Sequence, residues 1–215
     1  MIKAIFWDND GILVDTERLY FAATKKILAT VDIELTKEMY IDYFLIRGNG
    51  TWHLARKKGL SSDVINNLRN ERNVLYGQML ESECDIIDGA KEVVEALYGK
   101  CLMGIVTSSR KDHFEIIHES LGILEYFDFI LTGDDYKKFK PDPEPYLLAV
   151  EKSGFHKDEC IAIEDSERGL NSAKVAGIYC FVIPNELTSN GNFLAADKVL
   201  KNISELPTEL SELMF

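Results

Sequence analysis

The sequence alternates short apolar runs with segments of helical periodicity. Five runs are bounded by polar or turn residues and have the length of buried strands: residues 4–7, 102–106, 129–131, 161–163 and 179–183. Between them, apolar residues are spaced as on one face of a helix, as in Val93, Val94 and Leu97. This alternation predicts an α/β fold with a doubly wound, parallel, Rossmann-like sheet.

One long segment breaks the alternation. Residues 16–82 show helical periodicity without a convincing buried strand, as in Leu19, Ala23 and Ile27. A chain of 215 residues can hold one core and a sizeable insertion. We therefore expect an α/β core from residues 1–15 and 83–215, with residues 16–82 as a helical cap inserted after the first strand. The two linkers between them can act as a hinge.

The charge and the apolar pattern restrict the partners of the chain. The net charge is −12, from 24 Lys+Arg and 36 Asp+Glu, and no basic stripe with interleaved aromatic residues offsets it, so nucleic acid is not expected as a partner. The four cysteines form no C-x-x-C pair and are expected to be reduced thiols. We see no signal-peptide pattern and no apolar stretch near the ~20 residues of a membrane span. These features favour a cytoplasmic protein without a membrane partner.

Two carboxylates follow the first apolar run directly. Asp8 and Asp10 occupy alternate positions, and Gly11 allows the backbone to turn sharply after them. The crevice beyond the carboxyl ends of parallel strands is the usual ligand site of such sheets. Taken alone, the segment from Asp8 to Gly11 is explained equally well as an ordinary turn with solvated acids.

Three further strand ends carry polar residues that suit chemistry on a phosphate. Thr107 and Ser108 follow the second run, Lys140 follows the third, and Glu164 and Asp165 follow the fourth. Taken separately, these residues fit helix caps and a solvated surface charge. Taken together with Asp8, they supply the nucleophile, hydroxyl donor, cation and Mg²⁺ ligands that phosphoryl transfer needs.

The order and spacing of these motifs resemble the haloacid dehalogenase superfamily over essentially the whole chain. The motifs are the decapeptide DNDGILVDTE that begins at Asp8, Thr107, the KPDP segment at Lys140 and the EDS segment at Glu164. The helical insert is similar to the cap of the β-phosphoglucomutase and phosphoglycolate phosphatase-like branch. Asn9 departs from the large apolar residue that this branch often has.

The resemblance implies a role for each matched residue. Asp8 would be the nucleophile that forms an aspartyl phosphate, and Asp10 the acid and base that protonates the leaving oxygen and activates water. Thr107, with Ser108 beside it, would bind the phosphoryl group, and Lys140 would neutralise charge between that group and Asp8. Mg²⁺ would be held by Asp8, the main-chain carbonyl of Asp10, and Asp165, with Glu164 in or next to this ligand set.

The same resemblance favours phosphate esters as substrates, because members that act on haloacids or phosphonates lack an aspartate at the position of Asp10. We expect a Mg²⁺-dependent phosphatase for a small phosphorylated metabolite, such as a sugar or polyol phosphate. Two alternatives are a phosphomutase of the β-phosphoglucomutase kind and a non-catalytic binding module. In the cap, Tyr20 takes the apparent place of a mutase histidine, and Tyr20 and Arg47 are candidate substrate-binding residues. The substrate, and whether the protein is a monomer or a homodimer, stay open.

Overall fold

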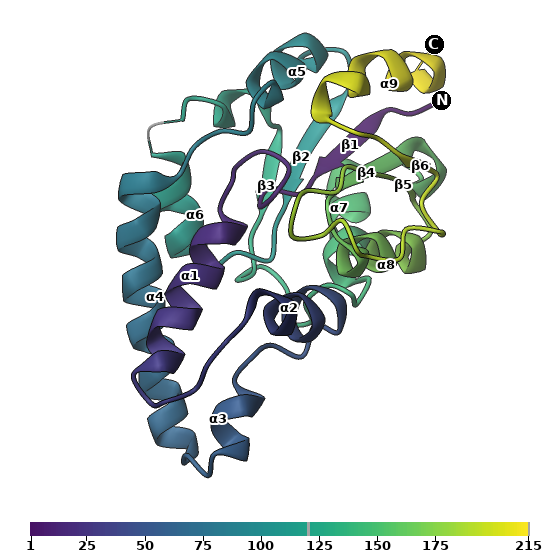
Figure 1. Cartoon of the computed structure of the whole chain (residues 1–215). Helices are drawn as coiled ribbons and strands as arrows, with labels where there is room; N and C mark the ends of the chain where they lie inside the picture. The colour runs from purple at the N-terminus through teal and green to yellow at the C-terminus, as the bar shows by residue number, and fades with distance from the viewer. Residues whose placement is uncertain (120, 215) are drawn as a thin grey trace.

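The computed structural model describes residues 1–119 and 121–214. Six strands in this part of the chain form a wholly parallel sheet in the order β3-β2-β1-β4-β5-β6 (Figure 1). The strands are β1 (Ala4–Trp7), β2 (Leu102–Val106), β3 (Phe129–Leu131), β4 (Cys160–Glu164), β5 (Tyr179–Val182) and β6 (Lys198–Val199). The α/β fold expected from the sequence is confirmed. The fourth strand is longer than expected, the fifth ends one residue earlier, and β6 was missed because its two residues make no apolar run.

The two faces of the sheet bury different helices because side chains alternate along a strand. Ile5 and Trp7 of β1 belong to one core cluster with residues of α5 (Ala90–Leu97), α6 (Lys111–His118) and α9 (Leu206–Met214). Ala4 and Phe6 belong to the opposite cluster with α7 (Glu144–Ser153) and α8 (Glu167–Ala176). Helices on both faces are the arrangement that the alternating pattern predicts.

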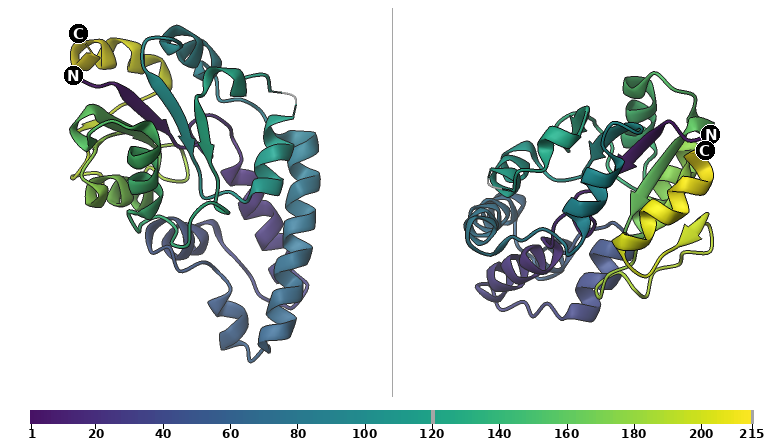
Figure 2. Two further views of the ribbon diagram at one scale, coloured as in Figure 1. Left: turned by 180° about the vertical axis from the view of Figure 1, so that it is seen from behind. Right: turned by 90° about the horizontal axis from the view of Figure 1, so that it is seen from above.

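The cap consists of the helices between β1 and β2 that precede α5. They are α1 (Glu17–Ala29), α2 (Lys37–Tyr40) with the π-helical turn η1 (Ile41–Ile46), α3 (His53–Lys57) and the long α4 (Ser62–Glu83). A core of its own joins these helices, with Leu28, Tyr40 and Trp52 among its buried residues. Figure 2 shows the cap beyond the ends of the strands. The short turns elsewhere are η2 (Leu124–Tyr126), η3 (Lys157–Glu159) and η4 (Ile203–Glu205).

The two linkers to the cap run side by side. The amide of Asp15 donates to the carbonyl of Asp85 over 3.0 Å, and the amide of Ile87 donates to the carbonyl of Leu13, also over 3.0 Å. These bonds hold the entry and the exit of the cap together at one point, directly after the Asp8–Asp10 segment. Among the described residues, no helix has the length and apolar character needed to cross a bilayer.

Candidate active site

The candidate site begins where β1 ends in the middle of the sheet. The amide of Asp8 donates to the carbonyl of Ile163, so the ladder to β4 continues one residue past the strand. Gly11 then turns the chain at φ +88°, and a Cβ at this position would lie 2.4 Å from Oδ2 of Asp165. Only glycine lets this loop come so close to the end of β4. The close approach places Asp8 beside Asp165.

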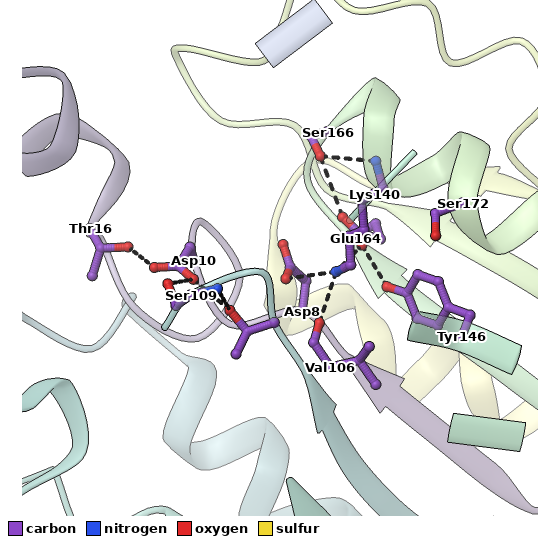
Figure 3. Close-up of polar contacts among 12 residues, drawn as sticks. Asp8, Asp10, Thr16, Val106, Ser109, Lys140, Tyr146, Glu164, Ser166 and Ser172 are labelled. Atoms are coloured by element: carbon purple, nitrogen blue, oxygen red, sulfur yellow. Dashed lines mark hydrogen bonds and ion pairs between the residues drawn. The ribbon is translucent and has the colours of Figure 1, made fainter. Parts of the chain in front are cut away.

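Lys140 joins the ends of three strands. Its buried Nζ donates to Oδ1 of Asp8 over 2.9 Å, to Oε1 of Glu164 over 2.6 Å and to the carbonyl of Val106 over 2.8 Å (Figure 3). Burial opposes the charge of the ammonium group, but the carboxylates of Asp8 and Glu164 raise the pKa of Lys140. Lys140 is therefore a fixed cation next to the expected nucleophile.

Glu164 is fully buried and is held from several sides. The phenol of Tyr146 on α7 donates to its Oε1 over 2.5 Å, the same oxygen that accepts from Lys140. On α8, Gly169 lies against this carboxylate, because a Cβ there would be 1.9 Å from Oε2. Sequence reasoning missed Tyr146, which lies among the apolar residues of a helix and carries no motif of its own.

Three buried carboxylates form a candidate metal site. Asp8, Glu164 and Asp165 each place an oxygen so that the three lie within 4.8 Å of one another. Burial and the nearby Glu164 raise the pKa of Asp8 to about 7, although Lys140 lowers it; burial and Asp8 raise the pKa of Asp165 well above its usual value. Crowded acids of this kind fit a divalent cation with oxygen ligands, which would supply the missing positive charge.

The carboxylate of Asp10 lies apart from this acidic cluster. It accepts from the hydroxyls of Thr16, Thr107 and Ser109, the last two over 2.8 Å each. The expected metal ligand of Asp10 is its main-chain carbonyl, and that role stays a prediction. Thr107 is buried and its hydroxyl is directed at Asp10, so its expected contact with a phosphoryl group stays a prediction as well. Ser109 was missed because hydroxyl residues before a helix are ordinary caps.

A cavity of about 350 Å³ opens over these groups between core and cap. Asp8, Asp10, Ser108 and Lys140 line it from the core, and the Oγ of Ser108 is buried without a hydrogen-bond partner in the described part of the chain. A buried hydroxyl of this kind, in the wall of a cavity, suits an oxygen atom of a substrate.

The two candidate residues of the cap have different surroundings. Tyr20 lines the cavity, where its ring stacks on Phe44 with the centroids 5.1 Å apart. Arg47 does not line the cavity: its side chain is exposed and pairs with Asp42 over 2.8 Å. The structure therefore brings Tyr20, but not Arg47, to the cavity.

Four further charged residues line the cavity: Glu17, Arg72, Arg110 and Arg168. Burial raises the pKa of Glu17, although Arg168 lowers it, and Tyr40 donates a hydrogen bond to its carboxylate. Glu17 was within a quoted motif, but no role was assigned to it. In the sequence, Arg72 and Arg168 resemble other solvated helix charges, and only the packing of α4 and α8 distinguishes them.

Comparison with known proteins identifies the family. Residues 5–183 match the sequence profile described as "Haloacid dehalogenase-like hydrolase". The chain belongs to this family of hydrolases.

Three relatives illustrate its range. The chain is 27% identical to a phosphorylated carbohydrates phosphatase of Thermotoga maritima, with 82% of each chain covered. It is 28% identical to the β-phosphoglucomutase of Bacillus subtilis, with 97% of this chain and 93% of the relative covered. The crystal structure of a mutant of CbbY from Rhodobacter sphaeroides in complex with xylulose-(1,5)bisphosphate has a TM-score of 0.82 and 26% identity, with 96% of both chains covered.

Proposed function

We propose that this protein is a Mg²⁺-dependent phosphatase that hydrolyses a small sugar or polyol phosphate through an aspartyl phosphate on Asp8. The observation that carries the proposal is the position of Asp8. Its carboxylate lines the cavity, accepts a hydrogen bond from the buried ammonium group of Lys140, and lies near two more acids that could hold a metal ion with it. Relatives that act on or bind phosphorylated sugars support the substrate class.

In the first step, an oxygen of Asp8 attacks the phosphorus while the bond from phosphorus to the ester oxygen breaks. Asp10, in its protonated form, gives its proton to that leaving oxygen, so that an alcohol departs. Lys140 offsets the repulsion between the anionic nucleophile and the anionic phosphate. A magnesium ion held by Asp8, Asp165 and Glu164 would supply further positive charge for the transferring group.

In the second step, water attacks the phosphorus of the aspartyl phosphate and gives a proton to Asp10. The bond between phosphorus and Asp8 breaks, inorganic phosphate leaves, and both carboxyl groups return to their starting states. The hydroxyls of Thr16, Thr107 and Ser109 orient the carboxyl group of Asp10 for these two proton transfers.

The decisive experiment is a screen of phosphorylated metabolites with Mg²⁺, followed by the Asp8→Asn variant on the best substrate. We expect phosphate release by the wild-type protein and a loss of at least about a thousandfold in Asp8→Asn, with no acid-stable phosphoenzyme on rapid quenching. A folded Asp8→Asn variant that turns over at the wild-type rate would contradict the covalent route.

A phosphomutase is the second candidate, because the chain is similar to a β-phosphoglucomutase over nearly its whole length. A mutase must exclude water from the aspartyl phosphate while its phosphorylated intermediate reorients in the site. The assay incubates the protein with β-glucose 1-phosphate, a trace of the bisphosphate and Mg²⁺, and follows glucose 6-phosphate and free phosphate together. We expect hydrolysis to exceed isomerisation, and the reverse outcome would reject the phosphatase.

A further inference from the structure

Asn185 lies in the loop that follows β5, beside the acidic cluster. Its side-chain Nδ2 donates to Oδ2 of Asp165 over 2.7 Å. In the described part of the chain, this is the only hydrogen bond that the carboxylate of Asp165 accepts. The neighbouring carboxylate of Glu164, by contrast, accepts from both Lys140 and Tyr146. The orientation of Asp165 therefore depends on Asn185.

The side chain of Asn185 is itself fixed. Its Oδ1 accepts from the main-chain amides of Leu187 over 2.9 Å and of Thr188 over 3.1 Å. Because these amides bond to the oxygen of the side chain, its NH₂ group is the part that faces Asp165. Gly11 covers the bond, since a Cβ there would lie 2.8 Å from Nδ2 of Asn185 and 2.4 Å from Oδ2 of Asp165. The bond holds one oxygen of Asp165 and leaves the other for a metal ion.

The same loop contacts the cap. Leu187 packs against the hydrophobic cluster that joins the cap helices, and it lines a small crevice with Ile41 and Leu45 of η1. Glu186 also pairs with Lys37 of α2 over 2.5 Å, although an ion pair this exposed contributes little. The loop thus meets the cap through one residue and the expected metal ligand through another.

We infer that Asn185 is a positioning residue for Asp165, and that the loop of residues 185–188 couples the metal site to the packing of the cap. When the cap packs on Leu187, the loop keeps the turn in which Asn185 donates to Asp165. Metal binding and cap packing then favour each other, because coupling between two sites is reciprocal. The inference rests on the metal site of the proposed function, but Asn185 and Leu187 are not among the residues that line the cavity.

The first test compares Mg²⁺ affinities, measured in the free protein from the rise of Tm with the Mg²⁺ concentration. We expect Asn185→Ala to weaken the affinity about 10-fold, as the loss of a hydrogen-bond partner of a metal ligand does. Asn185→Ser should weaken it as much, because its hydroxyl can still cap the turn but is too short to reach Asp165. Asn202→Ala is the matched control: Oδ1 of Asn202 also accepts from an amide two residues further on, and its Nδ2 donates to Glu205 at the surface.

The second test removes the contact with the cap. We expect Leu187→Ala to weaken the Mg²⁺ affinity about 2- to 5-fold, and to have no further effect when added to Asn185→Ala, because the coupling runs through Asn185. Leu60→Ala is the control and should leave the affinity unchanged, since Leu60 packs against the same cluster from the segment between α3 and α4. With the best substrate, the Mg²⁺ concentration that gives half the maximal rate should rise in Asn185→Ala, while the rate at saturating Mg²⁺ falls less than the affinity.

A wild-type Mg²⁺ affinity in Asn185→Ala or Asn185→Ser would overturn the inference, and so would an equal loss in Asn202→Ala or Leu60→Ala. Independent, additive losses from Leu187→Ala and Asn185→Ala would overturn the coupling. If Asn185→Ala did not fold, Asn185→Ser would take its place in both comparisons. A wild-type Tm that Mg²⁺ does not raise would overturn the inference together with the metal site. Failure of the proposed function looks different: no phosphate would be released from any metabolite, while the Mg²⁺ affinities would still separate the variants.

Discussion

At the residue scale, the contacts of Glu164 show how one buried acid is kept in place. A lone ionised carboxylate in the interior is unfavourable, and here Lys140 and Tyr146 both donate to the same oxygen. The ring of Tyr146 also lies 5.0 Å from the ammonium nitrogen of Lys140. Tyr146 therefore positions Lys140 and Glu164 together, although it is not among the residues that line the cavity.

We expect Tyr146→Phe to lower kcat by about 3- to 30-fold and to weaken Mg²⁺ binding, because Glu164 loses a hydrogen bond while the ring is kept. The metal readout is a calorimetric Mg²⁺ titration of the free protein. Tyr126→Phe is the control, since it removes a phenol–carboxylate bond to Glu95 at the surface. Unchanged kcat and Mg²⁺ affinity would assign Tyr146 to packing alone.

We expect Gly169→Ala to destabilise the protein by more than about 2 kcal/mol and to reduce activity, because its methyl group would overlap the carboxylate of Glu164. Gly77→Ala on α4 is the matched control: its Cβ would lie 3.5 Å from Ile116, an ordinary contact, and alanine favours a helix. Urea unfolding of both variants measures the difference. A Gly169→Ala protein as stable as wild type would mean that Glu164 can move freely.

Most of the site residues that could be predicted from the sequence follow strands directly, whereas Lys140, well after the end of β3, was singled out by its KPDP segment. Asp8, Thr107 and Asp165 follow apolar runs, and parallel strands bring such positions to one edge. Tyr146 and Arg72 could not be predicted in this way. Their importance depends on which partners α7 and α4 face across the fold, and a tyrosine or an arginine in a helix carries no signal of that.

At the scale of elements, helix α6 is tied to the loop after β1 by one buried polar contact. Nε2 of His118 lies 2.7 Å from Oδ1 of Asn9, whose main-chain carbonyl also accepts bonds from the turn that follows. Asn9 was noted as a departure from an apolar residue, and no role was expected for His118. The contact explains why a polar residue is accommodated at position 9, because helix α6 brings His118 into the interior as a hydrogen-bond partner for Asn9.

This contact predicts a pH dependence of stability. Burial lowers the pKa of His118 from 6.5 to about 4, although Asp10 opposes the shift. Below pH 6.5 the unfolded chain takes up a proton that the native imidazole does not, so stability is lost as the pH falls from 6.5 towards 4. A pKa shift from 6.5 to about 4, at about 1.4 kcal/mol for each pH unit, gives a total of about 3 to 4 kcal/mol.

The measurement is urea unfolding between pH 7 and pH 4.5. His118→Gln cannot titrate and should show a shallower loss than wild type, whereas His156→Gln, whose side chain is exposed, should follow the wild-type curve. If the unfolding free energies of His118→Gln and wild type fell in parallel with pH, the native imidazole of His118 would not be neutral as expected.

At the scale of the whole molecule, the doubly wound sheet could be predicted because its central strands are continuous apolar runs. The packing of the cap could not, since it depends on α1 meeting α4 and on Tyr76 and Leu80 of α4 joining the core cluster of the sheet. These contacts hold the cap over the acids and close the cavity around them.

We expect Mg²⁺ to stabilise the whole fold at neutral pH. The raised pKa of Asp8 means that the metal-free protein loses stability as the pH rises from about 4 to about 7, and a cation bound to the native state reverses this loss. The Tm measured with Mg²⁺ should exceed the Tm measured with chelator by several degrees at pH 7.5 and by less at pH 5. Asp165→Asn should reduce this difference in Tm. Equal Tm values with Mg²⁺ and with chelator in the wild-type protein would contradict a metal site among these acids.

The central place of β1 has a consequence for biosynthesis. β1 is made before the other strands of this sheet, yet it lies between β2 and β4, so both of its edges find partners only in residues made much later. The cap helices α1–α4 are contiguous in the chain and can pack on one another as soon as they emerge from the ribosome. Until β4 follows, the growing chain carries a formed cap beside an unpaired apolar strand at residues 4–7, the kind of segment that chaperones hold.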